Sequence, residues 1–69
     1  MPRRLSSGQI IEILEAHGFV RVSQRGSHIE FRPSSGRVVI VPAERREIPI
    51  GTTRSIIRQS GLDRTVFGF

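Results

Sequence analysis

The 69-residue chain has no cysteine, no tryptophan and no tyrosine. Without cysteine it forms no disulfide and offers no thiolate to a metal, and its two histidines alone argue against a zinc site. We therefore expect no metal and no other cofactor. The few aromatic residues are phenylalanines, and Phe19, Phe31 and Phe67 fall at positions that predict a place in the core. This leaves no exposed aromatic platform of the kind on which nucleic-acid bases stack.

Lysine is also absent, because all 11 basic residues are arginine. Against six acidic residues they give a formal net charge of +5 and a sequence pI near 11.8. The planar guanidinium fork suits phosphate, so this balance favours an anionic partner. The base composition of the genome explains the lack of lysine equally well, but it does not explain the net charge.

The chain contains no long apolar run, and we expect no signal peptide. Residues 1–5 are too short and too polar for a leader, and no stretch approaches the roughly 20 apolar residues that span a bilayer. We expect a cytoplasmic protein that does not contact membranes. The length fits one domain over residues 1–69, whose small core supplies no more than about 3 to 5 kcal/mol.

A capping box predicts where the first helix begins. Ser6 and Gln9 have its spacing, and Gly18 marks the exit. The core face of this helix comprises Ile10, Ile13, Leu14 and His17, with Ile11 beside it. We expect His17 to complement the negative end of the helix dipole.

Alternating apolar and polar residues predict three strands after this helix. In residues 19–24 the pattern places Val20 and Val22 on one face and Arg21 on the other. Residues 27–32 alternate again after the turn signal at residues 25–26. A turn at residues 33–36 then leads into the β-branched run 38–41, so the three strands form an antiparallel meander.

A surface loop at residues 42–50 precedes the second predicted helix. Gly51, Thr52 and Thr53 offer a hydroxyl cap, and Gly61 marks the exit. The apolar stripe of this helix comprises Thr53, Ile56, Ile57 and Ser60. Residues 62–69 either add one more turn over the core or fray. The result is an α+β fold in the order α-β-β-β-α, with both helices on one face of the sheet.

The other face of the sheet stays wet, and the titratable and basic side chains converge on it. The period-2 rule places His28, Glu30 and Arg32 there, and we expect Arg21 to join them. An imidazole titrates near neutral pH, so His28 marks the place where chemistry is expected. For Glu30 we favour an ion pair with Arg21 or Arg32 over a catalytic role.

Several motifs resemble the HicA family of toxins, over residues 5–67. They are Gly18-Phe19, residues 24–31 with Gly26-Ser27-His28, Val41-Pro42, Glu47-Ile48 and residues 51–61 beginning Gly-Thr-Thr-Arg. The resemblance implies a fold similar to a double-stranded-RNA-binding domain and ribosome-independent cleavage of mRNA, with His28 as the catalytic histidine. It also implies a HicB-type antitoxin partner, and contact with DNA only indirectly, through the antitoxin complex. Glu44 stands where family members often carry a second histidine.

These residues suggest a metal-independent endoribonuclease. RNA carries its own nucleophile, the 2′-hydroxyl, so that a positioned general base and donors for the phosphate suffice, and His28 fits the first role. The predicted RNA-binding residues are Arg21, Arg25, Ser27, Arg32, Arg45, Arg46, Thr52 and Arg54. Plain helix capping explains Thr52 equally well, and Arg45 and Arg46 also fit a solvated charge run. Two alternatives stay open: a non-catalytic RNA-binding module, and a domain that binds an acidic protein.

Overall fold

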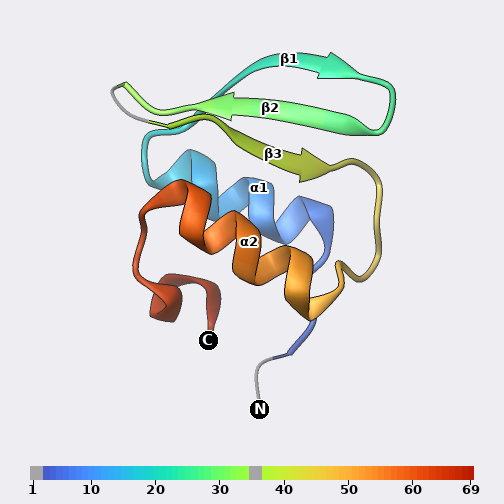
Figure 1. Cartoon of the computed structure of the whole chain (residues 1–69), viewed down its shortest axis with the longest axis vertical. Coiled ribbons are helices and arrows are strands. Elements are labelled where there is room, and N and C mark those ends of the chain that lie inside the picture. The colour runs from blue at the N-terminus through green and yellow to red at the C-terminus, as the bar shows by residue number, and fades with distance from the viewer. Residues whose placement is uncertain (1–2, 35–36) are drawn as a thin grey trace.

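A computed structural model describes residues 3–34 and 37–69 (Figure 1). Its elements are α1 (Ser7–Ala16), β1 (Val20–Arg25), β2 (His28–Arg32), β3 (Val39–Pro42), α2 (Ile50–Ser60) and a short 3-10 helix, η1 (Arg64–Phe67). The predicted α-β-β-β-α order is therefore confirmed. The predicted turn at residues 33–36 lies partly outside the described residues.

The three strands form one antiparallel sheet in the order β1-β2-β3, with β2 in the middle. Both long helices lie beneath the same face of this sheet, as predicted (Figure 1). Gln59 ties α2 to the edge strand β3, because its side-chain oxygen accepts a hydrogen bond from the backbone N–H of Ile40 at 3.2 Å. The opposite face of the sheet, called the outer face below, has no helix over it.

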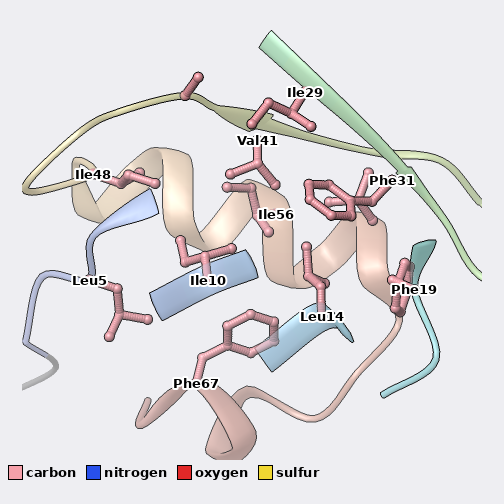
Figure 2. Packing of buried hydrophobic residues seen from close by; sticks show 12 residues of the cluster. Leu5, Ile10, Leu14, Phe19, Ile29, Phe31, Val41, Ile48, Ile56 and Phe67 are labelled. Carbon is pink, nitrogen blue, oxygen red and sulfur yellow. The ribbon is translucent and has the colours of Figure 1, made fainter. Parts of the chain in front are cut away.

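The core lies between the sheet and the helices (Figure 2). Ile29 and Phe31 of β2 alternate with exposed or half-exposed residues, as period 2 requires. The core also contains Leu5, Ile10, Leu14, Phe19, Val39, Val41, Ala43, Ile48, Ile56 and Phe67. Figure 2 shows Phe67 pointing from η1 toward α1, so the last stretch does form one more turn over the core. The predicted burial of Phe19, Phe31 and Phe67 is confirmed.

The ends of α1 follow the sequence signals. The Ser6 hydroxyl accepts a hydrogen bond from the Gln9 N–H at 3.1 Å, and the Gln9 side chain returns the bond to the Ser6 N–H at 2.8 Å. At the other end His17 is the C-cap, and its Nδ1 lies 2.8 Å from the carbonyl oxygen of Ile13. The capping box and the structural role of His17 at the helix end are both confirmed. The predicted place of His17 on the core face is wrong, because the C-cap residue is exposed.

The predicted facing of β1 is wrong. Arg21 pairs with the buried Phe31 and so lies on the helix side of the sheet, while Val20 and Val22 remain 62% and 48% exposed. The physical reason is that Phe19, just before the strand, takes the buried position and reverses the alternation that follows. A bulge between Arg21 and Ser23 then shifts the register for the rest of the strand.

The predicted hydroxyl cap of α2 is also wrong. The helix begins at Ile50, earlier than predicted, with Pro49 as N-cap and without a side-chain hydrogen bond at the cap. Thr53 therefore falls inside the first turn, where it is buried and its hydroxyl donates to the carbonyl oxygen of Pro49 at 3.3 Å. The predicted exit at Gly61 holds, since that residue adopts a left-handed conformation with φ of 70°.

Candidate functional site

His28 is the first residue of β2, and it is exposed on the outer face of the sheet. Its cross-strand partners are Arg25 on β1 and Pro42 on β3. Because residues directly opposite each other in a ladder share a face, the Arg25 guanidinium is carried on the same face as the imidazole. The structure thus places a titratable ring and a cation side by side at an open surface.

A two-residue turn, Gly26 and Ser27, connects Arg25 to His28. Gly26 has a φ of 56°, a conformation in which a residue with a side chain would be strained. Its carbonyl oxygen accepts a hydrogen bond from the side-chain amide (Nε2) of Gln24 at 3.1 Å. The Ser27 carbonyl oxygen accepts from the N–H of Ala43 at 2.7 Å. The tip of the hairpin is therefore anchored to the chain that leaves β3.

Ser7 of α1 holds the end of β3 and the loop that follows it by hydrogen bonds. The sequence did not predict Ser7 as a site residue. Ser7 is 4% exposed, and its hydroxyl donates to the Pro42 carbonyl oxygen at 2.6 Å while accepting from the Arg45 N–H at 2.9 Å. Its own N–H donates to the Arg45 carbonyl oxygen at 2.9 Å. A serine in the first turn of a helix is common, so its type and position alone gave no signal of this role.

One end of the molecule therefore collects most of the predicted site. The hairpin tip, the end of β3 and the first turns of both long helices all lie on the right of Figure 1. The residues gathered there are Arg25, Ser27 and His28 on the hairpin and Arg45 and Arg46 in the exposed loop that Ser7 holds. Glu44, in the same loop, has a φ of 55°, an uncommon conformation for a residue with a side chain.

The two predicted RNA-binding arginines of the sheet other than Arg25 lie away from the hairpin tip. Arg21 is on the helix side, with its guanidinium carbon 5.9 Å from the centre of the Phe31 ring, beside a depression that Gln24 and Arg45 also line. Arg32 shares the outer face with His28 but lies four residues farther along β2, about 13 Å away at the usual strand rise. The sequence prediction that Arg21 joins His28 is therefore wrong.

Thr52 and Arg54 belong to the first turns of α2. Thr52 is half-buried. Arg54 points its guanidinium over the ring of Phe69, with its central carbon 5.8 Å from the ring centre. That contact directs the Arg54 side chain toward the C-terminal segment, away from the hairpin tip.

Glu30 is occupied by neighbours on its own face. The Arg32 Nε donates to its carboxylate at 3.0 Å, and the Ser23 hydroxyl lies 3.4 Å away. The predicted ion pair is confirmed, with Arg32 as the partner. Glu30 therefore has a structural explanation that needs no catalytic role.

Within residues 3–34 and 37–69, no three side chains of histidine, aspartate or glutamate gather closely enough to hold a metal ion. Of the helices that the structure describes, none combines the length and the apolar character needed to cross a membrane.

Comparison with known proteins defines the class of this protein. A solved toxin–antitoxin complex from Streptococcus pneumoniae contains a chain with the same fold, with a TM-score of 0.73 and 27% identity over 84% of this chain and 98% of that one. A search of proteins with curated functions gave no significant match. The family model described as HicA toxin of bacterial toxin-antitoxin matches residues 7–62. The chain belongs to the HicA toxin family.

Proposed function

We propose that this toxin is an endoribonuclease that cleaves mRNA, with His28 as its general base and without a metal ion. The observation that carries the proposal is the pairing of an exposed His28 with Arg25 on the outer face of the sheet. The pair stands at a hairpin tip fixed by hydrogen bonds on both sides. Fixed geometry matters because a general base must reach its proton within hydrogen-bond distance.

The reaction uses the nucleophile that RNA supplies. His28 takes the proton of a 2′-hydroxyl, the oxygen attacks the adjacent phosphorus, and the bond from phosphorus to the 5′-oxygen breaks. The leaving oxygen takes a proton from water, which reaches the open face freely. The products are a 2′,3′-cyclic phosphate and a 5′-hydroxyl. Arg25 stabilises the negative charge that grows on the phosphate oxygens during the attack.

Backbone contacts rather than base contacts hold the RNA. Ser27 and Arg46 lie at the same end of the molecule as His28 and offer donors to phosphate oxygens. Arg45 lies at this end too, but it lines the depression on the helix side together with Arg21, so it would contact the RNA beyond the edge of the outer face. The phenylalanines of the core are buried and provide no stacking surface near the hairpin tip. We therefore expect weak sequence preference for the cleaved RNA.

An antitoxin of the HicB type is the protein partner we propose, by analogy with the toxin–antitoxin complex of similar structure. The outer face suits such a partner, because Val20 and Ile40 expose apolar surface on the strands that flank β2. DNA contact then arises through the antitoxin alone.

The test is cleavage of a defined RNA by the purified chain in excess EDTA. We expect the His28→Ala variant to lose a factor of about 10² to 10⁴ in rate, the usual contribution of a general base. His17→Gln is the matched control for the chemical step, because the His17 ring contacts the carbonyl oxygen of Ile13 at the C-terminal end of α1 and lies away from the hairpin tip. Mass spectrometry of the fragments should find a cyclic phosphate end.

Three results would overturn the proposal. A 3′-hydroxyl product or loss of cleavage in EDTA contradicts the mechanism. Full activity of His28→Ala contradicts the assigned base. If the folded wild-type chain binds RNA and never cuts it, the chain is a binding module in which His28 contacts phosphate.

A further inference from the structure

Two depressions run along α2 on the helix side of the molecule. The first has a volume of about 330 Å³ and is lined by Arg54, Ile57, Arg58, Arg64 and Phe69. The second, of about 520 Å³, lies at the C-terminal end of α2, where Arg37 joins Arg58. Arg58 lines both depressions, and we call the two together the α2 groove.

The described lining of the α2 groove carries positive charge and no negative charge. Its arginines are Arg37, Arg54, Arg58 and Arg64, and among the described residues that line it there is no aspartate or glutamate. The ion pairs found in the described part of the chain join Arg32 to Glu30 and Arg4 to Glu47, and so involve none of these four. Protein surfaces usually intersperse charges of both signs, so this concentration calls for an anion.

The nearest acid along the chain, Asp63, is engaged in the cap of η1. The Asp63 carboxylate caps η1 by accepting hydrogen bonds from the N–H and the hydroxyl of Thr65, at 2.9 and 2.7 Å. It forms no ion pair with Arg64 within 4.0 Å. The hydrogen bonds from Thr65, and after them the charge of Arg64, lower the pKa of Asp63, but without an ion pair between Asp63 and Arg64 the guanidinium remains able to bind another anion.

The guanidinium groups in the groove are spaced and oriented by the fold. Arg54 and Arg58 are one helical turn apart, a rise of about 6 Å along α2. The Phe69 ring lies under the Arg54 guanidinium at 5.8 Å, an attraction between cation and ring that restricts this side chain. The repeat along the helix is comparable with the spacing of successive phosphates in a nucleic-acid strand.

We propose that the α2 groove binds the phosphate backbone of single-stranded RNA, as a second contact separate from the His28 surface. Guanidinium forks bind phosphate oxygens in pairs, and a guanidinium plane held on a ring also offers a face to an unstacked base. An acidic protein segment would need only charge, whereas the spacing of Arg54 and Arg58 along α2 and the aromatic ring beside the Arg54 guanidinium fit a nucleotide strand. This inference rests on the proposed RNA substrate.

The α2 groove lies away from the proposed general base, so its proposed role is to bind RNA and not to catalyse its cleavage. His28 is on the outer face of the sheet, whereas α2 and η1 lie on the other side (Figure 1). A strand bound in the groove is therefore held away from the general base. The groove supplies affinity and retention of long RNA, and a fragment too short to reach it gains nothing from it.

The test measures RNA binding without cleavage, in the His28→Ala background, as a function of salt. For single strands, log K falls with log salt by about 0.7 for each phosphate neutralised. Replacing Arg54 and Arg58 together by glutamine should lower that slope by about 1.4 and weaken binding of an unstructured RNA roughly tenfold or more at 0.1 M salt. The Arg54→Lys/Arg58→Lys variant keeps the charge and should restore most of the slope.

The matched control is Arg3→Gln/Arg4→Gln, which removes the same charge from a different surface. Arg4 is paired with Glu47 at 3.9 Å, and Arg3 lines a depression that Glu12 shares. We expect the control to change the slope much less than the double variant in α2. Circular dichroism checks each fold, and Arg64→Gln provides a separate test if the double variant in α2 does not fold.

If the slope of log K against log salt changes equally in the α2 variant and in the control, the inference is overturned, because the effect then depends only on the net charge of the protein. Unchanged RNA binding together with weaker antitoxin binding would also overturn it and make the groove a protein interface. The outcome is separable from the catalytic proposal. If the wild-type chain never cleaves RNA, but the salt dependence of its RNA binding depends on Arg54 and Arg58, the proposal for the α2 groove stands and the catalytic proposal fails.

Discussion

Arg25 and His28 face each other across the ladder of β1 and β2, one on each side of the two-residue turn at the hairpin tip. The turn fixes their separation, because residues that flank a two-residue hairpin loop are obligatory ladder partners. In the proposed mechanism, the Arg25 cation lies next to the phosphate that adjoins the attacking 2′-hydroxyl.

The first prediction concerns this pair. Arg25→Gln should lower the rate of RNA cleavage about 10²-fold with little change in stability, since the cation is exposed and acts on charge formed in the transition state. Single-turnover kinetics at saturating RNA measures the effect on chemistry. Arg3→Gln removes an equal charge far from the hairpin, and an equal rate loss in that variant would contradict the assigned role.

The second prediction concerns Ser7. Ser7→Ala leaves the part-buried Pro42 carbonyl and the Arg45 N–H without their partner and should cost about 1 to 2 kcal/mol of unfolding free energy. Urea denaturation measures this loss. The exposed Ser34 provides the control, because Ser34→Ala should change stability by less than about 0.5 kcal/mol. Similar stabilities for the two variants would show that Ser7 does not hold the loop.

The third prediction tests the facing of β1 with two substitutions of the same type. Val41→Ala removes two methyl groups from a site with 0% exposure and should cost about 2 kcal/mol or more. Val20→Ala, at a site 62% exposed, should cost much less. Comparable losses in thermal unfolding would mean that Val20 is buried after all and that the sequence alternation was right.

The fourth prediction concerns pH. The hydrogen bond from the Thr65 N–H, followed by that from its hydroxyl, lowers the pKa of Asp63 below its usual value. A depressed pKa in the folded state stabilises the fold above the unfolded value of about 3.9, and this contribution disappears as the pH falls through the lowered value. The melting temperature of wild type should therefore exceed that of Asp63→Asn at neutral pH. The difference should shrink below about pH 4; a constant difference would contradict the ionised cap.

Patterns among neighbouring residues predicted the helices and strands correctly where the residues that they mark as apolar are also the ones that pack in the core. The capping box at Ser6 and Gln9 and the stripe of Ile10 and Leu14 depend on neighbours three or four residues apart, and the structure confirms them. The alternation of Ile29 and Phe31 likewise identified the buried face of β2. These features need no knowledge of distant residues.

The same logic failed on β1, because this strand lies at the edge of the sheet that the helices leave uncovered, unlike the other edge strand, β3. Val20 and Val22 have the right spacing for a buried face, but the helices do not reach over β1, and every residue of the strand is exposed. Phe19 is the residue that enters the core. A bulge, which shifts the register of the pairs that follow it, leaves no clear mark in the sequence.

The sequence by itself determined the number and order of the elements, the faces of β2 and α1, and His28 as an exposed residue beside a turn. Those properties follow from periodicity and from the conformations that glycine, proline and capping residues favour. Only the tertiary structure decided which arginines gather. Arg25 stands opposite His28, Arg21 turns to the helix side, and Arg58 joins the α2 groove. Strand register and helix docking bring together residues far apart in the chain, and no local pattern encodes that arrangement.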